Sequence, residues 1–162
     1  MTATLPVARA TGQRAADEAF DFLRYFEGRT RGHGLFEDRF GRVRAKFNVE
    51  MVGTWKGTAF VLDEHFVYDS GDQETRCWIV HHGEGRTFRA TCEGAASDAI
   101  GRNLPGMVEM RYRFQLPVRG RRITFDFLDR LFDLGEGRAL NRVRVSKWGL
   151  RVGELTLMFQ KS

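Results

Sequence analysis

The sequence predicts an all-β fold, an antiparallel meander barrel of about 8–10 strands with a short N-terminal helix. From about Thr30 to the C-terminus, polar and apolar residues alternate with a period of two, which puts successive side chains on opposite faces of a strand. Short glycine-containing links separate these runs, and 18 Gly against 3 Pro are typical of tight hairpins. About ten strands with one helix cannot cover both faces of an open sheet, so we expect closure into a barrel.

The elements follow from these patterns in order. Residues 1–14 are expected to form a flexible arm, and residues 15–162 a single barrel domain. A helix is expected over 15–26, ended by Gly28, because apolar residues recur there at helical spacing: Ala16, Ala19, Phe20, Leu23 and Phe26. This helix either packs on one end of the sheet or forms a lid over a ligand cavity. The strands are expected at 30–37, 43–53, 57–69, 74–82, 86–93, 95–101, 107–118, 121–133, 139–147 and 150–160.

Composition and charge exclude several classes of function. Of the 26 basic residues 4 are Lys, so 22 are Arg, and the formal net charge is +5. The arginines are spread along the strands opposite acidic partners and form no dense basic run, so nucleic acid is not an expected partner. No signal peptide, lipoprotein signal or apolar membrane span is visible, and Cys77 and Cys92 make no disulfide framework. We expect a cytoplasmic protein with reduced thiols.

Two hairpin registers predict which side chains face inward. A turn at Trp55-Lys56 separates an apolar from a polar face in the second hairpin. Its inward pairs are Met51–Phe60, Val49–Leu62, Phe47–Glu64, Ala45–Phe66 and Val43–Tyr68. A turn at Arg119-Gly120 gives Leu116–Ile123, Phe114–Phe125, Tyr112–Phe127 and Met110–Asp129 inside, and Arg113–Asp126 outside. Each apolar stripe therefore contains one carboxylate, Glu64 or Asp129.

The hairpin around residues 83–85 allows two registers. A three-residue loop places Arg76 on the inner face, where it offers a countercharge to Glu64. Its pairs are Val80–Phe88, Trp78–Ala90 and Arg76–Cys92. A two-residue loop instead puts Ile79 inside and sets Cys77 opposite Cys92, where the two thiols could form a disulfide. The first register is favoured, because it packs an apolar set against Trp78.

Polar residues on the inner face need an explanation, because a buried charge is costly unless it is paired or solvated. One explanation is a structural salt-bridge network, or carboxylates at the wet rim of the barrel. The other is a mostly apolar cavity with a few polar anchors, which describes a small-molecule site. The candidate ligand-binding residues are Glu64, Tyr68, Arg76, Trp78, Tyr112, Phe114, Phe127, Asp129 and Asn141.

Other chemistry finds little support in the sequence. The histidines and cysteines have no metal-ligand spacing, no nucleophile elbow occurs, and no cofactor is expected. Catalytic candidates are limited to Glu64 and Asp129, because an apolar wall raises a carboxyl pKa toward neutrality. The segment Ser146-Lys147-Trp148-Gly149 is interpreted as a tight strand connection that covers a barrel end, or as a mouth where Lys147 contacts an acidic head group.

The sequence resembles an uncharacterised family of bacterial proteins, many of them lipoprotein-like, over residues 22–161. The motifs that carry the resemblance are Phe66-Val67-Tyr68-Asp69, Arg76-x-Trp78, Leu116-Pro117-Val118, Asp126-Phe127-x-Asp129, Asn141-Arg142, Ser146-Lys147-Trp148-Gly149 and Gly153-Glu154-Leu155-Thr156-Leu157. The resemblance implies a calycin-like barrel of the lipocalin and fatty-acid-binding kind, and a link to modified fatty acids such as those made by cyclopropane-type acyl methylation. It implies no established activity, and membrane anchoring is not carried over because no lipoprotein signal is visible.

The leading hypothesis is an intracellular barrel that binds a lipid or fatty-acyl-like molecule. Arg76, with Tyr68 or Tyr112, would hold a carboxylate, since Arg matches that group bidentately. The apolar chain would lie among Phe47, Phe60, Leu62, Phe66, Phe114, Phe125 and Phe127. One alternative is an enzyme of lipid modification with Glu64 or Asp129 as general acid or base. Another is a non-catalytic partner protein with a filled barrel.

Overall fold

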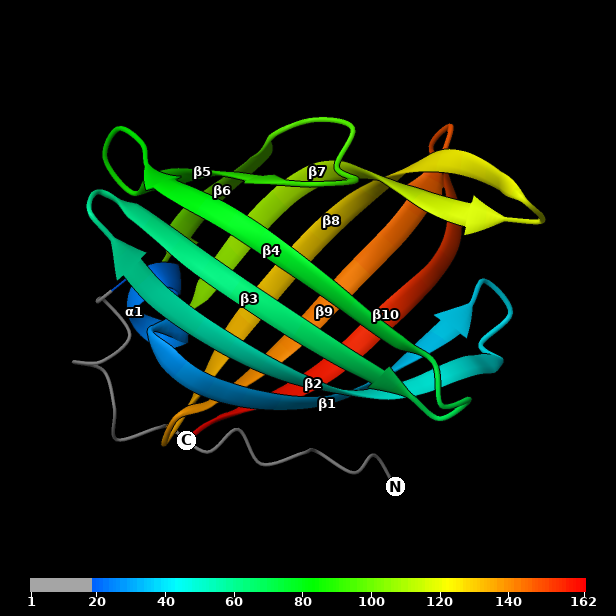
Figure 1. Ribbon diagram of the computed structural model, residues 1–162, viewed down its shortest axis with the longest axis horizontal. Coiled ribbons are helices and arrows are strands. Elements are labelled where there is room, and N and C mark those ends of the chain that lie inside the picture. The colour runs from blue at the N-terminus through cyan, green and yellow to red at the C-terminus, as the bar shows by residue number, and fades with distance from the viewer. Residues whose placement is uncertain (1–18) are drawn as a thin grey trace, which may run out of the picture.

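Ten antiparallel strands form a closed barrel in the computed structural model, which describes residues 19–162 (Figure 1). The strand order around the barrel is β1-β10-β9-β8-β7-β6-β5-β4-β3-β2, so every chain neighbour is also a spatial neighbour and β1 closes onto β10. The predicted all-β antiparallel barrel is thus confirmed. The elements are α1 (Phe22–Phe26), β1 (Gly28–Asp38), β2 (Val43–Lys56), β3 (Ala59–Tyr68), β4 (Gln73–His82), β5 (Thr87–Cys92), β6 (Ala99–Leu104), β7 (Met107–Val118), β8 (Arg121–Gly135), β9 (Arg138–Lys147) and β10 (Leu150–Lys161).

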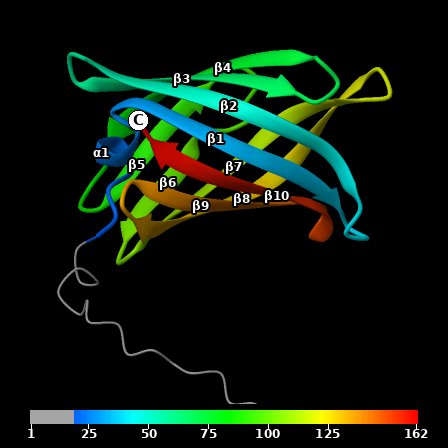
Figure 2. The ribbon, with the colours of Figure 1, turned by 90° about the horizontal axis from the view of Figure 1, so that it is seen from below.

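The helix α1 is shorter than the predicted helix over 15–26 and closes one end of the barrel (Figures 1 and 2). It begins after Asp21, whose carboxylate accepts hydrogen bonds from the backbone N–H groups of Leu23 and Arg24 and so satisfies two of the free donors of the first turn. Tyr25 ties the helix to the β8–β9 turn by donating to the carbonyl of Gly137, 3.0 Å away. The predicted arm over 1–14, and residues 15–18 of the predicted helix, lie outside the described residues.

The β7–β8 register is confirmed, but the predicted β2–β3 register is wrong. Tyr112 lies opposite Phe127 and Met110 opposite Asp129, as expected from the turn at Arg119-Gly120. In the second hairpin Met51 pairs with Glu64 rather than with Phe60, because the turn forms after Lys56. Gly57 supplies the positive φ, 63°, that a tight turn requires at this point. The partners shift by an even number of residues, so each side chain keeps its predicted face.

The β4–β5 hairpin follows neither predicted register. Val80 pairs with Ala90 and Trp78 with Cys92. The longer loop is closed by two backbone hydrogen bonds, from the N–H of Gly83 to the carbonyl of Thr87 and from the N–H of Thr87 to the carbonyl of Glu84. The inward faces of Arg76, Trp78 and Val80 are retained, since the shift is again even. The alternative with Ile79 inside is wrong: Ile79 is exposed, and Cys77 and Cys92 are free thiols.

Aromatic side chains of α1 pack against the barrel wall at the end that the helix closes. Phe22 stacks on Phe88 with ring centroids 4.8 Å apart, and Phe26 meets Phe159 edge to face at 5.4 Å. The close approach of α1 to the wall requires a glycine, because a Cβ on Gly53 would overlap the carbonyl of Phe26. Toward the other end the barrel is hollow, and this hollow part holds the candidate site.

Candidate functional site

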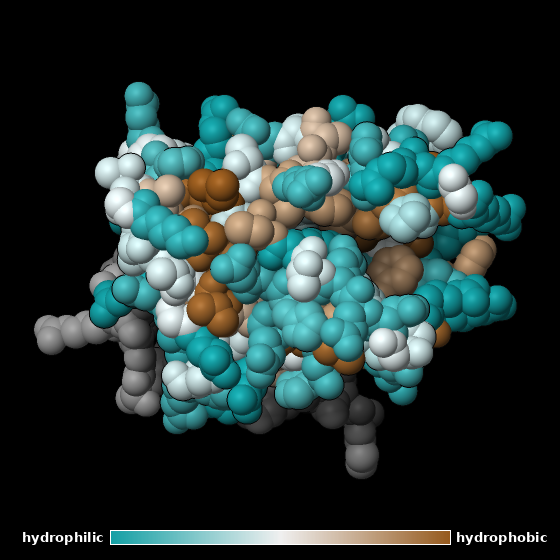
Figure 3. Space-filling view, viewed as in Figure 1, coloured by the Kyte–Doolittle hydropathy of each residue, from teal (hydrophilic) through white to brown (hydrophobic). Residues whose placement is uncertain are grey.

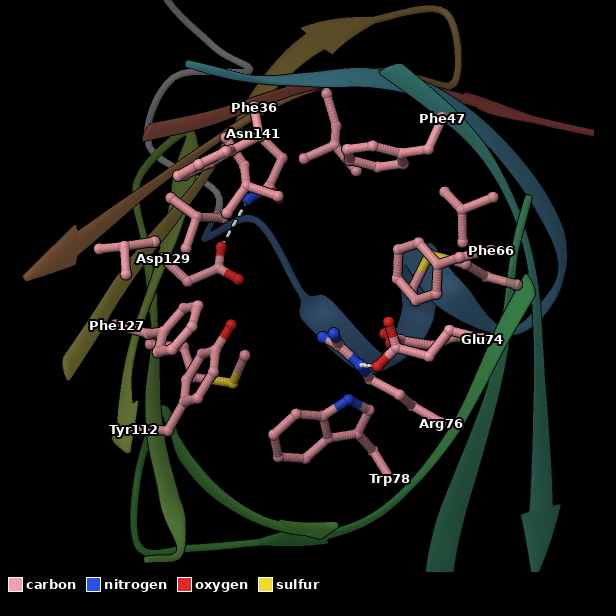
Figure 4. Close-up of a pocket in the computed structure, with 18 of the residues that line it drawn as sticks. Phe36, Phe47, Phe66, Glu74, Arg76, Trp78, Tyr112, Phe127, Asp129 and Asn141 are labelled. Atoms are coloured by element: carbon pink, nitrogen blue, oxygen red, sulfur yellow. Dashed lines mark hydrogen bonds and ion pairs between the residues drawn. The ribbon is translucent and has the colours of Figure 1, made fainter. Parts of the chain in front are cut away.

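A cavity of about 490 Å³ occupies the interior of the barrel (Figure 4). Phe22 and Phe26 of α1 form its floor, and Pro117 and Val152 lie near its mouth at the opposite end. Eight of the nine predicted ligand-binding residues line this cavity: Glu64, Tyr68, Arg76, Trp78, Tyr112, Phe127, Asp129 and Asn141. The ninth, Phe114, is buried on the same inward face and packs against Arg76 and Trp78, but it does not line the cavity itself.

Of the seven residues predicted to surround the apolar chain of a ligand, some line the cavity and others belong to the packed core. Five of its seven members line the cavity: Phe47, Leu62, Phe66, Phe125 and Phe127. Phe60 is fully buried at the closed end beneath Trp55, with ring centroids 5.2 Å apart, and so belongs to the packed core together with Phe114. The cavity is therefore lined by aliphatic and aromatic side chains, with a few polar groups among them.

The first polar cluster is centred on Arg76 in β4. Its Nε donates to Oε1 of Glu74 at 2.8 Å, and the hydroxyl of Tyr68 donates to Oε2 of the same carboxylate at 3.0 Å. The guanidinium lies between the rings of Phe66 and Phe114, 5.1 and 4.7 Å from their centroids. Burial by itself lowers the pKa of Arg76, but the negative charges of Glu74 and Glu64 raise it by more. The pKa is therefore higher than the usual value for arginine, and the group stays charged.

Glu64 is not the ion-pair partner that the sequence predicted for Arg76. The two residues are opposite each other in the β3–β4 ladder, yet Arg76 leans along its own strand toward Glu74. Burial raises the pKa of Glu64 to about 7. Arg76 opposes this shift and the charge of Asp129 adds to it. Glu64 is consequently a carboxyl group that changes its charge near neutral pH inside an apolar cavity.

The second polar cluster lies across the cavity on β8 and β9 (Figure 4). Asn141 donates from Nδ2 to Oδ1 of Asp129 and to the carbonyl of Arg130, the latter at 3.1 Å. Burial raises the pKa of Asp129 to about 6, while hydrogen bonds from Asn141 and Tyr112 oppose the increase. Tyr112 is held in place by stacking on Phe127, with ring centroids 5.0 Å apart.

These clusters give the cavity two polar poles in an apolar surround. One pole, on β3 and β4, contains a permanent cation beside one ion-paired carboxylate and one carboxyl that titrates near neutrality. The other contains an acid with a pKa of about 6 that accepts hydrogen bonds. Such a site can hold an apolar molecule and orient its polar groups. Over residues 19–162 no group of three or more His, Cys, Asp or Glu side chains could hold a metal ion.

Sequence reasoning missed several contributors to the site, among them Glu74, Phe22 and Phe26. Glu74 shares the inward face of Arg76 by the period of two, so its position in the strand could have identified it. Phe22 and Phe26 were placed on the expected helix, but their role as the floor of the cavity depends on where the helix docks.

No helix of the described part of the chain is long and apolar enough to cross a membrane.

The fold and the cavity define a class of protein, the hollow and closed antiparallel β-barrels. The chain belongs to a family of proteins of unknown function, DUF3833, whose model matches residues 5–161. No curated protein matches the sequence. Among solved structures, the S-type phycobiliprotein lyase CPES from Guillardia theta is similar, with a TM-score of 0.65 over 94% of this chain and 99% of that chain. The identity of 8% means that this likeness concerns the fold alone.

Proposed function

We propose that the protein is an intracellular binding protein for a lipid or fatty-acyl-like molecule, which it holds inside the barrel. The observation that carries the proposal is the cavity of about 490 Å³, lined by aromatic and aliphatic side chains around a buried arginine. Small-molecule sites typically enclose about 300–1,000 Å³ and combine apolar walls with few polar groups. Free thiols at Cys77 and Cys92 support an intracellular setting. A role in modified fatty acid metabolism rests on the family resemblance.

Arg76 is the proposed anchor for an acidic head group. Its ion pair with Glu74 uses Nε, and the terminal nitrogens point into the cavity (Figure 4). Two such nitrogens can bind a carboxylate through parallel hydrogen bonds. Glu64 and Asp129 are near enough to repel an anion, but their raised pKa values reduce that repulsion around neutral pH.

The alkyl part of the ligand would lie between the two poles and the floor. Phe47 and Phe66 face this space from β2 and β3, and Phe127 faces it from β8 (Figure 4). Burial of each methylene group contributes about 0.8 kcal/mol, so a chain enclosed over much of its length binds strongly without further polar contacts. The cavity also argues against the hypothesis of a filled barrel that acts only as a partner protein.

Native mass spectrometry, followed by lipid extraction, tests the proposal. We expect the purified protein to carry an apolar ligand, and Arg76→Met to bind a fluorescent fatty acid more weakly than wild type. The matched control is Arg113→Met, which removes an arginine from the outer face, where it pairs with Asp126 at 3.4 Å. Recovery of the protein without lipid, together with equal fatty acid binding by wild type and Arg76→Met, would overturn the proposal.

A second candidate is an enzyme that modifies a lipid. The observation that favours it is the pair of carboxyl groups in one cavity with pKa values of about 7 and about 6, since general acids and bases work best near the operating pH. If the protein is found to convert a lipid, the rate should show a bell-shaped dependence on pH, and Glu64→Gln should abolish one arm of that profile. An unchanged profile would exclude Glu64 from that role.

A further inference from the structure

The open end of the barrel carries apolar side chains that folding leaves in solvent. Three hairpins end there and follow one another around the rim, since the strand order is β2, β1, β10, β9, β8, β7 (Figures 1 and 2). We call their tips, residues 39–42, 118–122 and 147–151, the tip face. Phe40 is 68% exposed, Leu150 66% and Trp148 85%. Large apolar side chains with this exposure gain nothing from the core.

Trp148 is the clearest case, because its backbone conformation is also unfavourable. It occupies the first position of a two-residue turn with φ 51°, a left-handed conformation in which Gly, Asn and Asp are normally found. A tryptophan here adds strain to the folded state, and its side chain is almost fully in water. Neither turn chemistry nor packing explains the residue, which points to a contact outside the chain.

Basic residues surround these apolar groups on the tip face. Its three segments contain seven basic residues and no Asp or Glu: Arg39, Arg42, Arg119, Arg121, Arg122, Lys147 and Arg151. The guanidinium of Arg39 lies 4.6 Å from the ring centroid of Phe40, and Nζ of Lys147 lies 5.1 Å from that of Trp148. In Figure 3 the end of the molecule where these hairpins lie shows protruding hydrophilic side chains beside isolated hydrophobic ones.

We propose that the tip face docks on the surface of an anionic phospholipid bilayer. Trp148, Phe40 and Leu150 would enter the interfacial region, where aromatic side chains are favoured, and the basic residues would bind lipid phosphates. The other two hairpins of this end, β3–β4 and β5–β6, carry acidic residues in their connections and would face away from the bilayer: Asp69, Asp72, Glu93 and Asp98. The docked barrel would thus be tilted, with its mouth partly toward the lipid.

A bilayer fits these observations better than an acidic macromolecule does. Leu150 is aliphatic and stacks on no base, and exposed apolar groups at separate hairpin tips suit a fluid surface rather than a shaped partner. Cavity-lining residues continue from the same hairpins, Val118 from β7–β8 and Val152 from β9–β10. A ligand could therefore pass from lipid to cavity along an apolar edge. The docking proposal itself requires no ligand and does not rest on the proposed function.

Flotation with phosphatidylcholine vesicles, with and without phosphatidylglycerol, tests the docking. We expect wild type to bind only the anionic vesicles, with a blue shift of tryptophan fluorescence. Trp148→Asn combined with Phe40→Ser should reduce this binding by about tenfold, and so should Arg39→Gln, Arg119→Gln and Arg121→Gln combined. Asn suits the left-handed turn position, so the first variant keeps the fold.

The matched control is placed at the opposite end. Leu134→Asn with Arg86→Gln and Arg138→Gln removes one exposed apolar and two basic side chains near the turns around α1. Equal loss of vesicle binding in this control, or no vesicle binding by wild type, would overturn the proposal. A different combination of results would also overturn it: the arginine variant loses binding to DNA or heparin, and Trp148→Asn binds vesicles as well as wild type does. Displacement of a fluorescent fatty acid in solution is also measured on all variants, so that an effect on vesicle binding can be distinguished from an effect on ligand binding.

Discussion

Arg76 donates from Nε to Oε1 of Glu74, 2.8 Å away, although Glu64 lies directly opposite it in the β3–β4 ladder. The barrel thus encloses a charged arginine whose charge is only partly balanced by a neighbour on its own strand. Glu64 is left to respond to burial, and its pKa rises to about 7. We therefore expect Glu74 to influence the preference for a ligand and Glu64 to influence the pH dependence of stability.

Glu74 should compete with a ligand carboxylate for Arg76. Glu74→Gln removes the competing charge, so we expect higher affinity for a fatty acid and no change for its methyl ester. Arg76→Met should lower fatty acid affinity by about tenfold to a hundredfold, since a hydrogen bond to a charged group contributes about 1.5–3 kcal/mol. Displacement of a fluorescent probe by acid and ester measures both effects. Parallel changes for acid and ester would contradict a carboxylate site at Arg76.

Glu64 should make the protein less stable as the pH rises toward neutrality. Its pKa is raised from 4.5 to about 7 in the folded state, so the folded protein binds more protons than the unfolded chain in this window. Stability must then fall as pH increases from 4.5 to about 7, and Glu64→Gln should be more stable than wild type above pH 7, by up to about 3 kcal/mol.

Urea unfolding at a series of pH values measures this effect. In Glu64→Gln the slope between pH 6 and 7 should disappear, while the slope from Asp129 remains below about pH 6, where that carboxyl titrates. Glu50→Gln, on the outer face of β2, is the control. A wild-type stability that does not decrease between pH 6 and 7 would show that Glu64 is not held in its neutral form.

Asn141 should support the charged form of Asp129. Asn141→Leu removes a donor to this carboxylate, so the pKa of Asp129 should rise above its present value of about 6. The variant should lose stability at pH 8 by about 1–3 kcal/mol more than at pH 5, because an unsatisfied buried charge is expensive. Adding Asp129→Asn should remove the pH-dependent part of the loss. If the loss is the same at both pH values, packing rather than hydrogen bonding explains it.

Gly53 should be essential for the docking of α1. A Cβ at this position overlaps the carbonyl oxygen of Phe26, and backbone atoms cannot move aside as a flexible side chain can. Gly53→Ala is expected to lower the free energy of unfolding by about 1–3 kcal/mol, a typical cost of overpacking. Thr54→Ala, at the exposed next position, should change it by less than about 0.5 kcal/mol. Thermal unfolding compares the two, and equal melting temperatures would contradict a tight α1–β2 contact.

Much of the fold was predictable because alternation is a local property of the chain. The period of two assigns each side chain to a face, and glycine-containing links mark most of the turns. Even the two wrong hairpin registers kept the correct faces, since Met51–Glu64 and Val80–Ala90 differ from the predicted pairs by even shifts. The inward polar residues could therefore be identified from the residues that break the apolar stripe.

The amino-acid sequence was enough to predict the barrel, the inward faces and all the polar residues of the cavity except Glu74, because these depend on residue type and spacing along one strand. Three features became visible only in the three-dimensional structure: Glu74 rather than Glu64 is the partner of Arg76, Phe22 and Phe26 seal one end, and Phe114 packs against Arg76 without lining the cavity. These features depend on how side chains lean and on how distant segments meet when the sheet closes, and neither has a periodic signature in the chain.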